Sequence, residues 1–435
     1  MSKLLVGVGR EVITPEIGTD LAGYAARPST SVHDDLHATV FAFDTDGTKA
    51  LLVSIDMCNL KADGLKIAQA AVAEASGLPL TQIIIACTHT HSGPSCFNTA
   101  FMKGIFTTGV QKAIKTAMAN MKPAQMGIGT TLSDIAVNRR QIQENGKITL
   151  GQNPYGTYDP TMSVISFREP DGTPIGNIIH YGCHNTAAGR NPEITRDWCG
   201  VAVDRLEYLS GAVTCFINGC GGDCGPRLSN GKTSGLNNIS YALEHGGRAA
   251  LDAIRAWKNI QFWHDAPLSV VSEDIDLPLR VLPPVEEMRK RTARYEAMES
   301  MNNIQKGTYD TLMSRIRFVE SGKEQPMSKP IPTNLICIGP LALLPIPFEP
   351  FSTITLRIKD HSPYPYTICV GYANGSESYF PSIDQIPRGG YEVDMFIDRN
   401  LIPYADHAEQ SFVEGSLRML RTAYDEANTR QLTSY

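Results

Sequence analysis

The 435-residue chain has the composition of an ordinary globular protein, with 42% hydrophobic residues and a formal net charge of −6. Acidic and basic residues are mixed along the chain, so no basic stripe indicates nucleic-acid binding, and no apolar run is long enough to span a membrane. The N-terminal segment lacks the long apolar region and small-residue cleavage site of a signal peptide, which predicts a cytoplasmic protein.

Strands and helices alternate along the sequence, which predicts an α/β fold of mixed β-sheets covered by helices, in one large domain over residues 1–435. Strands are predicted within 4–20 and at 40–43, 50–55, 83–87, 125–132, 164–167, 175–181, 213–218, 334–338 and 341–346. Helices are predicted at 60–76, 107–121, 239–257 and 411–427.

Residues 283–321 differ from the rest because Pro283 and Pro284 open a charged, helix-rich stretch. We interpret it as a helical excursion from the main sheets. A solvated surface hairpin, a lid over a site and a contact in a homo-oligomer all fit this pattern.

The ten cysteines mostly lie in apolar or Gly-rich surroundings, which predicts free, buried thiols in a reducing compartment. Cys220 and Cys224 have a spacing that would suit a metal or redox pair. A Gly-rich turn that contains two thiols explains this segment better.

The most informative segment is Gln82–Pro94, in which an apolar β-branched run ends in Thr-His-Thr-His and a Ser-Gly-Pro turn. The run at 83–87 suits a strand buried on both faces. Residues two apart on a strand point the same way, so His89 and His91 are expected to project together from its end. Ligands gather at that end of open α/β sheets, and two imidazoles there predict a metal site.

Four further loops repeat this pattern of an apolar strand followed by polar residues. His184 lies among small residues just after one strand, whereas His180, within that strand, is expected to be a hydrogen-bonded core residue. Thr195 is a candidate N-cap for the helix that follows it, and Asp197 could orient a ligand histidine or a water molecule.

The last two loops contain one carboxylate each. Asp223 lies in a glycine-packed loop, where the backbone can approach a ligand closely. Glu349 lies in an apolar, Pro-rich segment, where a carboxylate is costly to bury unless it is paired or metal-bound; an exposed loop position fits equally well. Two imidazoles and one carboxylate are a common catalytic zinc set, and His89, His184 and Glu349 could supply it.

These motifs resemble the N-terminal catalytic domain of the neutral/alkaline, non-lysosomal ceramidases, over most of the chain. The family's characteristic segments have counterparts at Thr88–Pro94, Asn138-Arg139, His184, Gly222-Asp223 and Glu349. The family also uses a tyrosine ligand and a second active-site tyrosine twelve residues further on. Tyr379 and Tyr391 have this spacing.

The resemblance implies that zinc is held by His89, His184, Glu349 and Tyr379. It also implies substrate contacts at Thr195 and Asp223. The sequence departs from the family where Thr195 replaces a serine and Trp198 follows it, and the family's C-terminal immunoglobulin-like domain and secretion signal have no counterpart. The resemblance therefore supports zinc hydrolase chemistry more strongly than ceramide as the substrate.

We predict a zinc-dependent hydrolase that cleaves the amide bond of a small-molecule or lipid-like N-acyl substrate, in lipid metabolism. Zinc would activate a water molecule and polarise the scissile carbonyl. His91, able to titrate near neutral pH, is the candidate general acid or base. Positioned donors stabilise a developing oxyanion, and the candidates here are Arg139, Tyr379 and Tyr391. Asp197 and Asp223 would orient the ligands.

Three alternatives remain open at this stage. The same metal site could cleave an ester or a lactone. A metal-dependent amidohydrolase barrel also places an H-x-H motif at the end of a strand, but the long Pro-rich and helical stretches fit its eight βα units poorly. A ligand-binding protein with a decayed site is the third.

Overall fold

The computed structural model describes residues 4–25 and 27–433, so residues 1–3 of the N-terminal segment interpreted above lie outside the described residues. The first sheet has the strand order β7-β6-β5-β1-β8. These strands are β1 (Leu5–Val12), β5 (His37–Thr45), β6 (Thr48–Ile55), β7 (Ile83–Cys87) and β8 (Lys122–Pro123). A hairpin joins β5 to β6 through Asp46 and Gly47, both with positive φ, as a two-residue type I′ turn requires.

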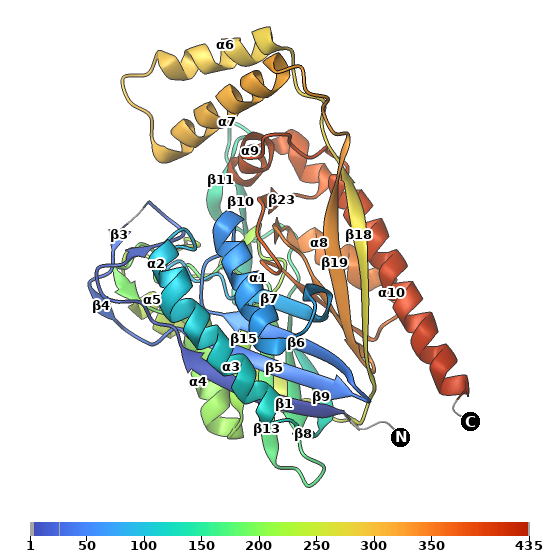
Figure 1. Ribbon diagram of the computed structural model, residues 1–435. Coiled ribbons are helices and arrows are strands. Elements are labelled where there is room, and N and C mark those ends of the chain that lie inside the picture. Colours follow the sequence, from blue (N-terminus) through green and yellow to red (C-terminus); the bar gives the residue numbers. More distant parts are fainter. Residues whose placement is uncertain (1–3, 26, 434–435) are drawn as a thin grey trace.

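Helices α1 (Ala62–Ser76) and α3 (Thr107–Ala119) cover one face of this sheet (Figure 1). α3 approaches β1 so closely that a Cβ at Gly7 or Gly9 would lie about 2 Å from an α3 carbonyl oxygen. The Gly-x-Gly pair is therefore a packing feature. Gly77 ends α1 in the left-handed conformation that favours glycine. A short helix α2 (Thr99–Phe101) and a π-turn at Met102–Phe106 precede α3.

The second sheet has the order β15-β13-β12-β9-β17. Its strands are β9 (Gln125–Leu132), β12 (Thr161–Arg168), β13 (Pro174–Tyr181), β15 (Val213–Asn218) and β17 (Trp263–His264). Helices α4 (Asp197–Ser210) and α5 (Ser240–Lys258) pack on its outer face around Trp198 and Phe216.

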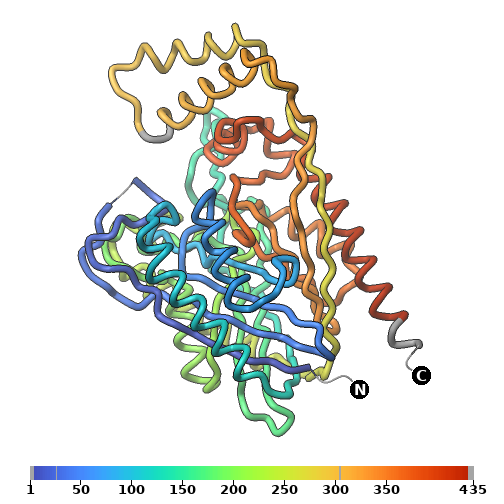
Figure 2. The backbone as a smooth tube through the Cα atoms, in the orientation of Figure 1, coloured from blue at the N-terminus to red at the C-terminus, as the bar shows by residue number. Residues whose placement is uncertain are grey.

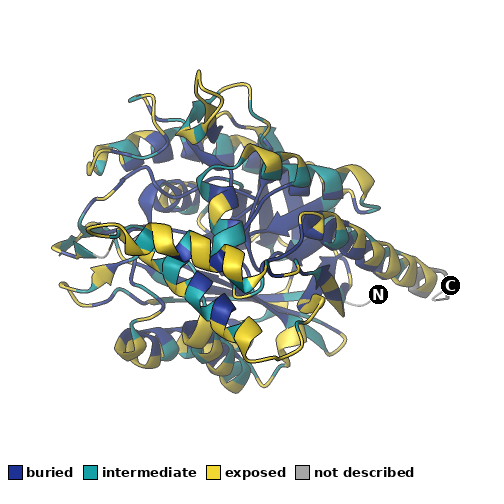
Figure 3. Cartoon of the chain, turned by 90° about the horizontal axis from the view of Figure 1, so that it is seen from above, coloured by how far each residue is buried: buried dark blue, intermediate teal, exposed yellow. Residues whose placement is uncertain are grey.

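The third sheet, with the order β18-β19-β20-β22, completes the layers. It comprises β18 (Leu268–Pro278), β19 (Ser328–Ile338), β20 (Leu341–Pro345) and β22 (Tyr366–Val370), and it packs against α8 (Ser352–His361) and α10 (Ala408–Thr433). The inner faces of all three sheets meet in one apolar cluster that includes Phe41, Ile217 and Leu343. Figure 3 shows this pattern from above, with buried strands and exposed outer faces of helices.

β7 is buried on both faces, as predicted. Ile83, Ile85 and Cys87 face the helices, whereas Ile84 and Ala86 face the other two sheets.

The predicted fold class is confirmed, because mixed sheets covered by helices make up the molecule. Several elements are longer than the sequence predicted. The last helix, predicted at 411–427, spans Ala408–Thr433, because the alternation of apolar and polar residues is weaker at the ends of an element than at its centre.

Smaller sheets lie between these layers. One has the order β11-β10-β16, formed by β10 (Ala136–Ile142), β11 (Ile148–Asn153) and β16 (Cys224–Pro226). The two-stranded pairs are β2 (Asp20–Leu21) with β3 (Arg27–Pro28), β4 (Ser31–Val32) with β14 (Glu193–Ile194), and β21 (Glu349–Pro350) with β23 (Tyr379–Phe380). Two 3-10 turns span Leu80–Gln82 and Ile383–Arg388.

The charged segment forms a helical hairpin of α6 (Val285–Glu296) and α7 (Asn303–Glu320), which extends away from the sheets (Figure 2). Its base packs on α9 (Tyr391–Asp398). The buried Arg315 side chain donates to the carbonyls of Ile397, Asn400 and Leu401 at the end of α9, where a cation is favoured by the helix dipole. Among the described residues, no helix is long and apolar enough to cross a membrane.

Candidate metal centre

Three loops converge on one buried point because each follows the carboxyl end of a strand in a parallel pair. β7 pairs with β6, β13 with β15, and β20 with β22. The loop after β7 contains His89, the loop after β13 contains His184, and the loop after β20 leads to Glu349. The structure thus brings together the three residues that the sequence proposed as a ligand set, and their ligand atoms all lie within 4.8 Å of one another.

The His89 backbone turns sharply after β7, with φ of 69°. This differs from the extended geometry expected of the pair, because the chain has already left the strand at Thr88. The two rings still meet, with His91 Nε2 3.2 Å from His89 Nε2. His89 Nδ1 lies 2.6 Å from the Cys58 carbonyl oxygen. A carbonyl only accepts, so Nδ1 carries the proton and Nε2 presents a lone pair.

His184 has the same arrangement. Its Nδ1 lies 2.7 Å from the Gly221 oxygen and 3.1 Å from the Cys224 oxygen, which leaves Nε2 as an acceptor. His184 Nε2 and Glu349 Oε2 are both buried without a hydrogen-bond partner. Glu349 Oε2 is 3.7 Å from the Nε2 atoms of both His89 and His184.

His184 Nε2 and Glu349 Oε2 therefore face each other as acceptors without a donor, a costly arrangement for buried groups, whereas His89 Nε2 has His91 Nε2 within hydrogen-bond distance. Nitrogen and oxygen ligands of a tetrahedral zinc ion, with bonds of about 2.1 Å, stand roughly 3.4 Å apart. The spacing of 3.7 Å fits such an ion. The backbone carbonyls that bind both Nδ1 atoms also provide the outer hydrogen bonds that ligand histidines usually have.

Electrostatics keep both imidazoles in the neutral form that a metal requires. Burial lowers the pKa of His89, although the Glu349 carboxylate opposes this effect. Burial also lowers the pKa of His184 well below its ordinary value, and the Arg139 guanidinium lowers it further.

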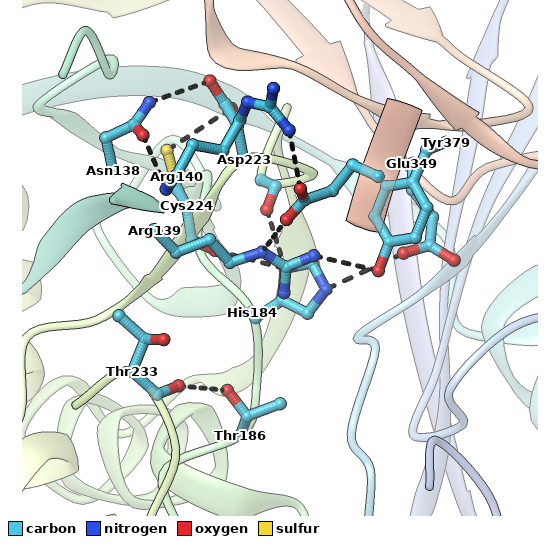
Figure 4. Close-up of polar contacts among 12 residues, drawn as sticks. Asn138, Arg139, Arg140, His184, Thr186, Asp223, Cys224, Thr233, Glu349 and Tyr379 are labelled. Atoms are coloured by element: carbon cyan, nitrogen blue, oxygen red, sulfur yellow. Dashed lines mark hydrogen bonds and ion pairs between the residues drawn. The ribbon is translucent and has the colours of Figure 1, made fainter. Parts of the chain in front are cut away.

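Arg139 and Tyr379 lie next to His184 (Figure 4). Tyr379 is in register with Glu349 in the β21–β23 pair, and its hydroxyl accepts a hydrogen bond of 2.9 Å from Arg139 Nη2. The Tyr391 ring packs edge-on against Tyr379. Burial raises the pKa of Tyr379 well above 10. The predicted role of Tyr379 as a metal ligand stays a prediction.

The pKa of His91 differs from the prediction that this side chain titrates near neutral pH. It is buried beside Tyr24, with ring centroids 4.9 Å apart. Burial and the neighbouring His89 lower the pKa of His91 well below its ordinary value, so the free side chain is neutral rather than titrating near pH 7. His91 Nδ1 has no hydrogen-bond partner and can accept a proton.

The Asp197 and Thr195 side chains make hydrogen bonds within the protein near His184, and their predicted roles at a ligand histidine, water or substrate stay predictions. The Asp197 carboxylate accepts from the amides of Ala187, Ala188 and Trp198, and so holds the loop after His184. Burial raises the pKa of Asp197 to about 6. The Thr195 hydroxyl donates to Asp34 and accepts from the Asp197 amide. Thr195 thereby caps the amide of Asp197, the first residue of α4.

The Asp223 carboxylate also accepts hydrogen bonds from protein donors, and its predicted contact with the substrate stays a prediction. Its carboxylate accepts from the Ser352 amide at 2.7 Å, the Ser352 hydroxyl at 3.1 Å and Asn138 Nδ2 at 3.1 Å (Figure 4). Burial raises the pKa of Asp223 to about 6. The residue joins β10, which contains Arg139, to the segment that follows Glu349.

Sequence reasoning missed three neighbours of this centre. Glu392 accepts hydrogen bonds of 2.8 Å from Arg139 and Arg140. Its position directly after the candidate active-site residue Tyr391 is the sequence feature that could have indicated it. Cys58 Sγ lies 3.7 Å from His89 Nδ1. The Tyr372 ring stacks on His89. All ten cysteines are free and buried, as predicted. His180 is a hydrogen-bonded core residue, as predicted, because its Nε2 donates to the Cys369 carbonyl oxygen at 3.1 Å.

A cavity of about 890 Å³ opens next to the histidine pair. Gly23 and Tyr24 are part of its wall and contact His91 directly. The lining mixes carboxylates with apolar side chains such as Phe97. A second, more apolar cavity of about 480 Å³ lies elsewhere, between α1 and the β18–β19 strands.

The fold and this cluster define an α/β protein with a candidate two-histidine, one-carboxylate metal centre. Residues 4–235, more than half of the chain, match the family model "Neutral/alkaline non-lysosomal ceramidase, N-terminal". The chain belongs to this family.

Named relatives agree with this assignment. The neutral ceramidase of Pseudomonas aeruginosa is 25% identical over 280 residues, which are 56% of this chain and 42% of that protein. Neutral ceramidase A of Dictyostelium discoideum is 28% identical over 208 residues, 43% of this chain and 29% of that protein. The matches thus span less than half the length of these relatives.

Solved structures show the same fold. The crystal structure of the Pseudomonas aeruginosa neutral ceramidase superposes with a TM-score of 0.74 at 20% identity, over 98% of this chain and 75% of that one. A structure described as ceramidase complexed with C2 gives a TM-score of 0.72 at 17% identity, over 98% and 76%.

Proposed function

We propose that this protein is a metal-dependent hydrolase of the amide bond in a ceramide-like N-acyl substrate, with zinc as the metal. The observation that carries the proposal is the convergence of His89 Nε2, His184 Nε2 and Glu349 Oε2, of which the last two are buried without a hydrogen-bond partner. Membership of the ceramidase family supports amide hydrolysis.

His89, His184 and Glu349 would hold the ion, with Tyr379 as a further candidate ligand. The ion would supply Lewis acidity toward the scissile carbonyl and a more acidic water. His91 Nδ1, buried and without a partner, accepts the proton that the attacking water loses and returns it to the leaving nitrogen. Arg139, held rigidly by Glu392, orients the Tyr379 hydroxyl beside the carbonyl.

The cavity beside His91 supports a substrate that is partly polar, because carboxylates and asparagines line it together with Leu21, Tyr24 and Phe97. Pockets that bind such ligands combine apolar walls with a few polar groups. This mixture suits the head of an N-acyl amino alcohol, with the acyl chain leaving toward the apolar side chains.

The test is hydrolysis of a panel of N-acyl sphingoid bases, N-acyl amino acids and matching esters, with and without a chelator. We expect cleavage of an N-acyl amide that is abolished by 1,10-phenanthroline and restored by added zinc. Cleavage of the esters alone would replace the amide by an ester or lactone as the substrate. No cleavage of any member by the metal-loaded protein would indicate a ligand-binding homologue and would overturn the proposal.

A further inference from the structure

Tyr372 contacts the candidate metal centre through both its backbone and its ring. It follows β22, and its backbone adopts φ of 54°, a strained conformation for a residue with a side chain. Its amide donates to the Phe348 oxygen, next to Glu349, and its carbonyl accepts from the Cys87 amide at the end of β7. The backbone of Tyr372 thus connects the loop of Glu349 to the loop of His89.

The Tyr372 ring contacts both candidate ligand histidines. It stacks on His89 with ring centroids 4.0 Å apart and planes at 23°, and it stands edge-on to His184 at 6.2 Å and 89°. The side chain is only 1% exposed. This packing fixes the ring next to the point where the three acceptor atoms meet.

The Tyr372 hydroxyl is buried without a hydrogen-bond partner. The nearby Arg139 guanidinium is engaged with Tyr379 and Glu392. A buried hydroxyl without a partner is costly to the folded protein. Together with the strained backbone, this cost indicates a donor kept free for a bound molecule.

We propose that Tyr372 is a catalytic residue whose hydroxyl donates a hydrogen bond to the carbonyl oxygen of the substrate. The inference rests on the proposed amide hydrolysis. The water oxygen forms a bond to the carbonyl carbon, and the carbonyl π pair moves onto oxygen, where Tyr372 stabilises it without losing its proton. The water proton passes to His91 and then to nitrogen as the C–N bond breaks.

The decisive variant is Tyr372→Phe, which retains the stacked ring and removes only the hydroxyl. We expect kcat to fall by about 10²-fold, the effect of losing one oxyanion donor. KM and the zinc affinity measured by chelator competition should change less than about twofold, since the ring and the ligands remain. The matched control is Tyr364→Phe, a tyrosine buried against Tyr424 in the core of the third sheet, which should leave kcat unchanged.

A readout that needs no turnover is the affinity of the metal-loaded protein for a phosphonamidate analogue, whose tetrahedral anionic phosphorus imitates the adduct. Tyr372→Phe should weaken this binding by about 10²-fold. Unchanged kcat and unchanged phosphonamidate affinity would overturn the proposal, as would a loss of zinc affinity as large as the loss of rate. If the wild type cleaves no amide, the proposed function fails, whereas the phosphonamidate comparison still decides the role of Tyr372.

Discussion

Replacing His184 by alanine is expected to abolish both metal binding and hydrolysis. His184 Nε2 is one of the three convergent acceptors, and the side chain is fully buried. A two-ligand remnant of His89 and Glu349 would hold zinc weakly, because catalytic sites use three protein ligands. We expect zinc content to fall from about one equivalent to near zero, and kcat/KM to fall by about 10³-fold, at the upper end of the loss when one main electrostatic stabiliser is removed.

The measurement is zinc stoichiometry by mass spectrometry on protein purified by gel filtration, together with the rate on the best amide. His180→Ala is the matched control, because His180 lies in the strand that precedes His184, is also buried, and has the Cys369 carbonyl oxygen as the hydrogen-bond partner of its Nε2. This control should retain full zinc. A His184→Ala protein that is folded and holds one equivalent of zinc would contradict the assignment.

Replacing Glu392 by glutamine is expected to destabilise the fold by about 3–5 kcal/mol, the range for breaking a buried ion pair from one side. Glu392 is 1% exposed, and its two carboxylate oxygens bind Arg139 Nε and Arg140 Nη1 at 2.8 Å each. The neutral amide leaves two buried guanidinium groups without their shared anion. Since Arg139 also donates to Tyr379, activity should decrease as well.

Urea unfolding measures this change as a lower midpoint with an unchanged slope. Glu286→Gln is the control, because Glu286 pairs with Lys290 on the exposed face of α6, where an ion pair contributes about 0–1 kcal/mol. A Glu392→Gln protein within about 1 kcal/mol of the wild type would show that the Arg139–Glu392–Arg140 group does not stabilise this region.

The sequence predicted the ligand set because its signals are local. An apolar run such as 83–87, followed by residues that are costly to bury, reports a buried strand and the loop at its end. Three parallel strand pairs then place their carboxyl ends together, so His89, His184 and Glu349 meet. The hairpin at Asp46-Gly47 was predictable for the same reason, since a two-residue turn requires particular residues.

The roles of the surrounding polar residues could not be read in this way. Asp197 and Asp223 lie in glycine- and cap-like contexts that fit ligand contacts equally well, and only the structure shows that backbone amides and Ser352 occupy their oxygens. Tyr372 reaches His89 through a stacking contact between loops that lie far apart in the sequence. No local pattern encodes such a contact.

The most direct test of the account is an anomalous difference map at the zinc edge, from crystals of the protein purified without added metal or with one equivalent of zinc. The account predicts one peak at about 2.0–2.2 Å from His89 Nε2, His184 Nε2 and a Glu349 oxygen. A peak held instead by Cys58, His89 and His91, the neighbouring group that could also take an ion, or no peak at this centre, would contradict it.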